Sequence, residues 1–219
     1  MSYLSLMELR AVILLILTSV LHPSFADEFP DDDLEERIEA VSDGELRFLP
    51  EPPAKPVHHH SNQIYISEES LTSGWVMLNQ CHFHLDPVAA VQIVFHADNI
   101  RNIDITESLG IDRSWVEENR VELEGVGKDA KLCLSTHSKA LHISEKGYEL
   151  KNGPYMRRFF DGYYPMQISI EISHPKSLLL VETQPMAQTG FKISNSGTVI
   201  KANGWFEGKL YTRFRYSKP

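Results

Sequence analysis

The chain has 219 residues, of which 42% are hydrophobic, and a formal net charge of -9 at pH 7. This length allows one full hydrophobic core and is short for two, so we expect one domain with a tail. An acidic chain without a glycine-rich phosphate-binding motif is poorly suited to nucleic acid, and we expect no nucleic-acid partner.

The first 26 residues have the features of a cleavable secretory signal peptide. Arg10 adds positive charge before an eleven-residue apolar run over residues 11–21, and Ser24-Phe25-Ala26 carries small residues where a signal peptidase reads. A spanning helix needs about 20 apolar residues, more than this run provides. We therefore expect cleavage after Ala26, a periplasmic or secreted protein, and no transmembrane segment in the mature chain. Retention as an amino-terminal anchor is the alternative.

Residues 27–60 are interpreted as an acidic, proline-rich, flexible leader. Residues 27–57 hold eleven acidic and three basic residues, a net charge of -8, whereas residues 58–219 have a net charge of only -1. The segment ends in a proline-rich run over residues 50–56, which favours extended backbone over packed structure. The remaining residues, 61–219, are predicted to form a single β domain.

Apolar and polar residues alternate along much of this domain, as they do in half-buried strands. Residues 166–173 show the strongest pattern, and residues 191–194 and 198–202 flank Asn195-Ser196-Gly197 as a hairpin. Asn203-Gly204 is interpreted as a turn before a last strand at 209–216. Further predicted strands are 75–85, 90–96, 101–105, 119–124, 131–135, 141–144 and 178–182, with a short helix at 112–118.

This spacing of short strands predicts an all-β fold. We expect an antiparallel β-sandwich, or a partly open barrel, with a carboxy-terminal β-meander and one or two short helices. Cys81 and Cys133 are the only cysteines. In an oxidising compartment they are expected to form one disulfide, which would close 52 residues of chain; a metal or redox pair lacks the close spacing that such sites show.

Histidine is the residue type whose placement suggests chemistry. His82, His84 and Asp86 would share one face of a strand, since alternate residues point the same way, and His96 lies on the next predicted strand. Imidazole and carboxylate groups are ligands for Cu or Zn, so these four residues are the candidate metal site. The alternative is an ordinary solvent-facing side of a strand.

A second candidate is the aromatic and basic segment 155–165. Aromatic rings beside arginine could stack on sugars or hold an extended peptide, and the alternative is a turn whose aromatic rings cover the edge of the core. The ligand-binding residues predicted here are Tyr155, Arg157, Arg158, Tyr163 and Tyr164.

The sequence favours an exported, non-enzymatic β-sandwich protein that binds an envelope protein partner or a small ligand. The most specific version of this hypothesis is that the protein binds a metal ion. One alternative is a secreted hydrolase of carbohydrate or cell-wall polymer, for which Asp161 would need a second carboxylate. The other is a structural component of an envelope or secretion assembly. The oligomeric state is left open by the sequence.

Overall fold

The structure is a computed structural model that describes residues 44–218. The signal peptide and most of the acidic leader lie outside these residues. The strands are β1 Arg47–Leu49, β2 His59–Tyr65, β3 Val76–Leu85, β4 Val88–Val94, β5 Ile100–Glu117, β6 Arg120–Ser138, β7 Leu141–Ser144, β8 Gly147–Tyr155, β9 Arg158–Phe159, β10 Gly162–Tyr163, β11 Met166–Ser173, β12 Leu179–Gln184, β13 Phe191–Asn195, β14 Val199–Glu207 and β15 Leu210–Ser217.

Two short helical segments accompany the strands, α2 Ser70–Ser73 and the 3-10 turn η1 Ala97–Asn99. Within residues 44–218, no helix has the length and apolar character of a membrane span. The prediction of an all-β sandwich is confirmed.

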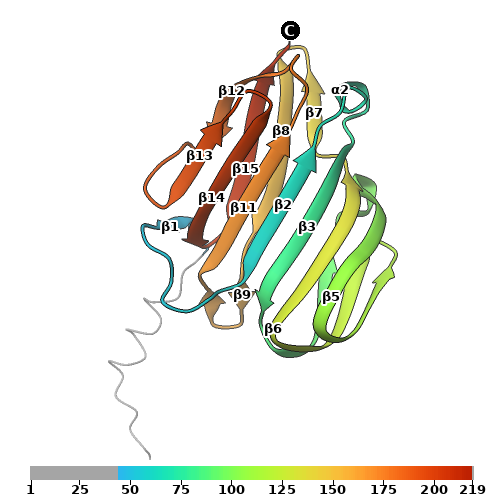
Figure 1. The fold of residues 1–219 in the computed structure, drawn as a ribbon, viewed down its shortest axis with the longest axis vertical. Helices are drawn as coiled ribbons and strands as arrows, with labels where there is room; N and C mark the ends of the chain where they lie inside the picture. Colours follow the sequence, from blue (N-terminus) through green and yellow to red (C-terminus); the bar gives the residue numbers. More distant parts are fainter. Residues whose placement is uncertain (1–43, 219) are drawn as a thin grey trace, which may run out of the picture.

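A nine-stranded sheet forms the larger layer. Its strands run in the order β1-β14-β11-β2-β3-β6-β4, with β13 added to β14 and β5 added to β6. All neighbours are antiparallel except β2 and β11, which pair in parallel. Because parallel neighbours need a long connection, the β2–β11 pair joins parts of the chain about a hundred residues apart. These strands cross the front of the molecule in Figure 1.

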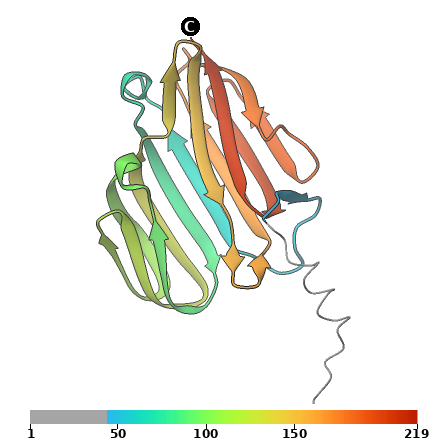
Figure 2. The same cartoon turned by 180° about the vertical axis from the view of Figure 1, so that it is seen from behind.

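A four-stranded sheet, β12-β15-β8-β7, forms the second layer. It packs on one face of the larger sheet. In Figure 2, which views the molecule from the side opposite to Figure 1, the smaller sheet lies in front. Both sheets contribute their alternate apolar residues to one core, as in other sandwiches. From the larger sheet come Ile64, Leu78, Ile168, Ile170, Ile200 and Phe206, and from the smaller one Leu150, Leu210, Phe214 and Tyr216.

A second hydrophobic cluster lies where the larger sheet extends beyond the sandwich. The strands β5 and β6 form a long hairpin, and β4 pairs with the first half of β6. Buried residues of β6, among them Val121, Leu123 and Leu132, pack there with side chains from β4 and β5. The domain therefore has two apolar cores along a single sheet.

Several local predictions differ from the structure. Residues 112–118 were predicted as a helix, but residues 112–117 form the end of β5 and Glu118 lies in the turn that follows. The long hairpin gives these residues cross-strand partners in β6, and such pairing favours strand over helix. Asn203-Gly204, predicted as a turn, lies inside β14. A Cβ on Gly204 would come 2.3 Å from the carbonyl oxygen of Gly190, so this glycine serves a close backbone approach.

The sheet begins earlier than the predicted domain boundary at residue 61. Within the proline-rich leader, β1 pairs with β14, and β2 starts at His59. Phe48 explains the first of these, since its ring stacks on Phe191 at 4.7 Å between centroids and packs against the core.

The carboxy-terminal strands are also arranged differently from a simple meander. The strands β13 and β14 form the predicted hairpin, but β15 lies in the other sheet, between β12 and β8. Gly208 allows this change of sheet, because it has φ +89° and a side chain there would meet the carbonyl oxygen of Glu45 at 2.0 Å.

The predicted disulfide between Cys81 and Cys133 is present. The two residues are directly opposite on β3 and β6, with their Cα atoms 4.1 Å apart. The bond therefore joins the strand next to the sandwich core to the strand that carries the second core.

Candidate functional site

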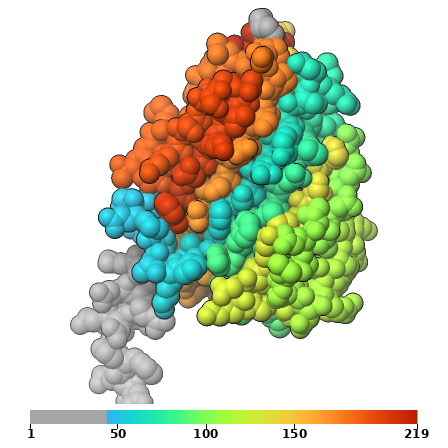
Figure 3. Space-filling model, in the orientation of Figure 1, coloured from blue at the N-terminus to red at the C-terminus, as the bar shows by residue number. Residues whose placement is uncertain are grey.

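The outer face of the larger sheet is the clearest candidate surface. The smaller sheet packs on the opposite face, and in the space-filling view the side chains of β14, β11, β2 and β3 form the front surface with no helix laid across them (Figure 3). The alternation of β11 explains its polarity. Met166, Ile168 and Ile170 are buried in the core, and Gln167 and Ser169 between them point outward.

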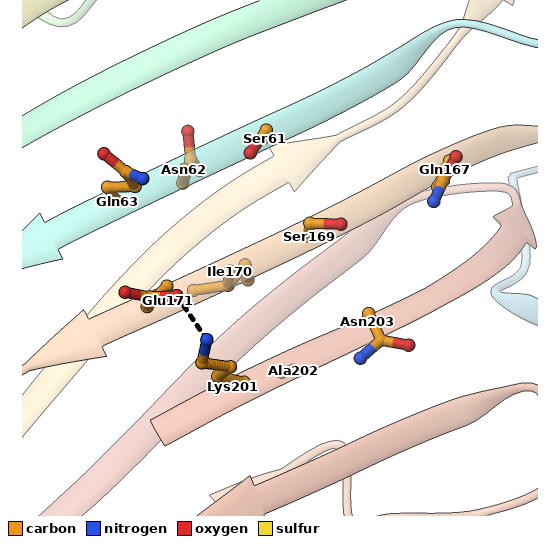
Figure 4. A pocket seen from close by; sticks show the side chains of 10 residues that line it. All are labelled: Ser61, Asn62, Gln63, Gln167, Ser169, Ile170, Glu171, Lys201, Ala202 and Asn203. Carbon is orange, nitrogen blue, oxygen red and sulfur yellow. Dashed lines mark ion pairs between the residues drawn. The ribbon is translucent and has the colours of Figure 1, made fainter. Parts of the chain in front are cut away.

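A shallow depression of about 250 Å³ lies on this face, over β2, β11 and β14. Close up, the polar side chains of the three strands project from the same side of the sheet (Figure 4). We call this set the polar sheet face; it consists of Ser61, Gln63, Gln167, Ser169, Glu171, Lys201 and Asn203. Asn62, Ile170 and Ala202 also line the depression, and all three are buried residues of the strands themselves.

The polar sheet face has no excess charge. Nζ of Lys201 lies 2.9 Å from a carboxylate oxygen of Glu171, across the β11–β14 register. These two are its only ionisable residues. A ligand in the depression would therefore meet neutral hydrogen-bonding groups and one ion pair that is already satisfied.

Aromatic side chains lie at one end of this face. Four residues on four neighbouring strands lie side by side in one row across the sheet. In order from β14 to β3 they are Trp205, Gln167, His59 and Phe83. The rings of His59 and Phe83 are stacked at 5.4 Å, and Nε2 of His59 lies 2.9 Å from Oγ of Ser169. Nζ of Lys131 stands 5.3 Å over the ring of Phe83.

A second polar group lies on the inner face of the same strands, between the two hydrophobic cores. The imidazoles of His58, His60 and His82 gather there, with 4.3 Å between the ring centroids of His60 and His82. We call these three the histidine cluster. Asn62 and Gln80 are buried beside it, and Asn62 donates to the hydroxyl of Tyr155 at 2.7 Å.

The hydrogen bonds of the histidine cluster fit neutral rings. The amide nitrogen of Gln80 lies 2.6 Å from Nε2 of His82 and can donate only if that ring nitrogen is unprotonated. Nδ1 of His82 then carries the proton and donates to Nε2 of His58 at 3.0 Å. Nε2 of His60 donates in turn to Oδ1 of Asn62 at 3.0 Å.

Burial acts in the same direction. It is the main cause that lowers the pKa of His58 to about 4, although Asp86 opposes the shift, and the pKa of His60 to about 3. Burial also lowers the pKa of His82 well below its usual value, with His60 and His58 adding to the shift. The three imidazoles are therefore uncharged at neutral pH.

The four residues of the predicted metal site lie in different surroundings. His82 belongs to the histidine cluster, whereas His84 is exposed and lies 3.2 Å from a carboxylate oxygen of Asp129. Asp86 accepts two hydrogen bonds from Arg157, and His96 precedes η1. The alternation of β3 breaks at a register shift between His82 and Leu85, where His84 has φ +53°.

Within residues 44–218, no group of three or more histidine, cysteine, aspartate or glutamate side chains has an arrangement that could hold a metal ion.

Of the five residues predicted to bind a ligand around 155–165, four lie together at the β9–β10 hairpin, where Arg157 stands 5.5 Å over the ring of Tyr164 and Arg158 pairs with Tyr163. Only Tyr155 lies apart from them. Tyr155 is 6% exposed and belongs to the sandwich core. Arg157 joins Asp86 through Nε at 2.8 Å and also donates to the carbonyl oxygen of Pro165. Tyr164 donates to Asp161. The ring of Tyr163 lies beneath both Arg158 and Lys209, at 5.6 and 5.4 Å.

The polar sheet face was missed in the sequence. The only indication of this face in the sequence is that every second residue of 166–173 is polar, a pattern that any strand with one solvent-facing side shows.

No family model matches the chain, and no curated protein matches it in sequence. Among solved structures, it is similar to an M1 zinc metallopeptidase mutant from Deinococcus radiodurans bound to a Tyr-Ser-Ala substrate, with a TM-score of 0.38 and 8% identity. A two-domain M1 zinc metallopeptidase mutant bound to L-tryptophan matches with a TM-score of 0.36 and 8% identity. Each match covers 73% of this chain and 42% of the solved one, so the chain spans about two fifths of these structures.

Proposed function

We propose that this chain is an exported, non-enzymatic binding protein whose ligand lies on the polar sheet face. The observation that carries the proposal is the depression itself, in which three adjacent strands direct neutral polar side chains to one uncovered place. Rigid strands hold such groups in fixed positions, which favours binding because little order must be gained when the ligand arrives.

Export is supported by two independent features. The first 26 residues have the composition of a signal peptide. Cys81 and Cys133, the only cysteines of the chain, form a disulfide, a bond that persists in oxidising compartments. Together they favour the periplasm or the extracellular space as the place where the ligand is met.

The chemistry of the depression favours binding over hydrolysis. Glycoside hydrolysis generally uses two carboxyl groups on either side of the bond that is cleaved. Among the residues that line the depression, Glu171 is the single carboxylate, and it is paired with Lys201. The imidazoles of His58 and His60 belong to the histidine cluster on the opposite side of the sheet, where they cannot act on a ligand. His59 lies on the ligand side, where its Nε2 is hydrogen-bonded to Ser169.

The proposal is tested by calorimetric titration of the mature protein, residues 27–219, with three probes: a neutral hexasaccharide of glucose, an oligogalacturonate, and an extended Gly-Ser peptide. We expect at least one probe to bind and to be recovered intact by mass spectrometry. Binding should be weakened about tenfold in Gln167→Ala/Asn203→Ala. The matched control is Gln184→Ala, an exposed amide on β12 of the smaller sheet.

Three results would contradict the proposal: binding of none of the probes, binding that is equal in both variants, or cleavage of the bound probe.

A further inference from the structure

We propose that the ligand of the polar sheet face is a neutral oligosaccharide. This inference rests on the proposed function and adds the chemical class of the ligand. It is carried by three properties of the face: its charge, its free hydrogen-bonding groups, and the row of rings at its end.

The charge of the face favours a neutral ligand. Lys201 and Glu171 neutralise each other at 2.9 Å, so neither is left to pair with a charged ligand. A site for an anionic polymer would carry unpaired arginine or lysine side chains, because such polymers are bound largely through those charges. None of the other residues of the polar sheet face is charged.

The free hydrogen-bonding groups match hydroxyls. Within residues 44–218, the side-chain amides of Gln167 and Asn203 and the hydroxyl of Ser61 have no side-chain hydrogen bond. An amide both donates and accepts, and so does a hydroxyl. A ligand whose surface is covered with hydroxyl groups can use both halves of each amide. An ionised ligand would use only one half.

The row of rings supplies flat apolar surface beside these polar groups. Trp205 is two strand spacings of about 4.8 Å from His59, roughly 10 Å, and three from Phe83, roughly 14 Å. Gln167 lies between them in the same row. Sugar rings have one apolar face and a polar edge, so a short chain of them can stack on a ring while its hydroxyls reach the amides.

An extended peptide suits this surface less well. Peptides that add to a sheet do so at an unpaired strand edge, through main-chain hydrogen bonds. The strands β2, β11 and β14 are paired on both sides, so the face offers side chains only. The absence of an edge in this part of the sheet therefore favours a ligand that is bound through its own polar groups.

The test uses the same three probes with one further pair of variants, Trp205→Ala and its control Tyr211→Ala, which removes an exposed ring from β15 of the smaller sheet. We expect the neutral hexasaccharide to bind best. We expect its affinity to fall about tenfold in Gln167→Ala/Asn203→Ala, as for the loss of two hydrogen bonds. Trp205→Ala should weaken it by a similar factor, and Tyr211→Ala should leave it unchanged.

The outcomes separate the inference from the proposed function. If the oligogalacturonate or the peptide binds more tightly than the hexasaccharide, and its binding is weakened in Gln167→Ala/Asn203→Ala, the ligand class is overturned and the binding face stands. If the hexasaccharide binds equally to all variants, both are overturned, as they are if nothing binds. Thermal unfolding of each variant confirms that the fold is intact before its affinity is compared.

Discussion

Nδ1 of His82 lies 3.0 Å from Nε2 of His58, so two imidazoles join the residue just before β2 to the second half of the adjacent strand β3. The outward neighbours of these residues, His59 and Cys81, belong to the opposite face. The same two strands therefore carry a buried polar cluster on one face and the candidate binding surface on the other.

Stability should decrease as the solution becomes acidic below pH 6.5. The folded pKa of His58 is about 4 and that of His60 about 3, below the ordinary value of 6.5, so the unfolded chain takes up protons first. The stabilisation is complete above pH 6.5 and is lost progressively toward pH 4 and pH 3. Each such histidine contributes a slope of about 1.4 kcal/mol per pH unit within its window.

The measurement is the free energy of unfolding, from urea titrations between pH 4 and pH 8. In His60→Gln, the slope of the free energy of unfolding against pH below pH 6.5 should fall by about 1.4 kcal/mol per pH unit, which corresponds to one proton fewer taken up on unfolding. His84→Gln, which changes an exposed histidine, is the control and should keep the slope of the parent protein. Equal slopes in all three proteins would contradict a neutral, buried cluster.

The disulfide should contribute strongly to stability. Cys81 and Cys133 are 52 residues apart, and a crosslink that closes a loop of that size stabilises by about 4 kcal/mol through the entropy of the unfolded chain. Replacing both cysteines by alanine should lower the free energy of unfolding by about that amount. Dithiothreitol should destabilise the parent protein similarly and leave the double variant unchanged. An effect of the reductant on the double variant would show that it acts elsewhere.

The Asp86–Arg157 pair should anchor the β9–β10 hairpin. Arg157 bonds Asp86 through two nitrogens, and the side chains of Arg157 and Asp86 are only 18% and 29% exposed, respectively. Arg157→Met should cost about 2 kcal/mol and speed hydrogen exchange in residues 158–163, since breaking a partly buried pair leaves a charge uncompensated. Arg113→Met removes an exposed pair with Glu124 and should cost less than about 1 kcal/mol. Equal costs would refute the anchoring role.

Gly204 should tolerate no side chain. A Cβ there would lie 2.3 Å from the Gly190 carbonyl oxygen and 3.0 Å from the ring of Phe191, so Gly204→Ala must push β14 and the β12–β13 connection apart. We expect a loss of about 2 kcal/mol or more, measured by urea unfolding. Ala202→Gly, on the same side of the same strand, is the control; it removes a buried methyl group and lowers strand propensity, and should cost about 1 kcal/mol. A smaller loss in Gly204→Ala than in the control would contradict the close approach.

The elements that were predicted correctly are those whose own sequence pattern specifies them, whichever strands they pair with. Residues 166–173 form β11 as expected, because their alternation already specifies one buried and one exposed face. By contrast, β6 was predicted as two strands. Gly125 and Gly127 suggest a break between them, yet pairing with β5 on one side and with β3 and β4 on the other carries the strand through.

The candidate site was harder to predict for the same reason. The polar sheet face exists only because β2 pairs in parallel with β11 and places Ser61 opposite Ser169. Sequence spacing carries no information on pairing between such distant segments. The histidine motif misled for a local reason, because the register shift after His82 separates His84 from the face that strict alternation would give it.

The most direct test of the central claim is an NMR titration of the isotope-labelled mature protein with the neutral glucose hexasaccharide. We expect the shifted resonances to come from outward residues of β2, β11 and β14, including the side-chain amides of Gln167 and Asn203 and the indole of Trp205. The exposed side of β12 and β15 should be unaffected. Shifts confined to the smaller sheet or to the β9–β10 hairpin, or no shifts at all, would contradict the account.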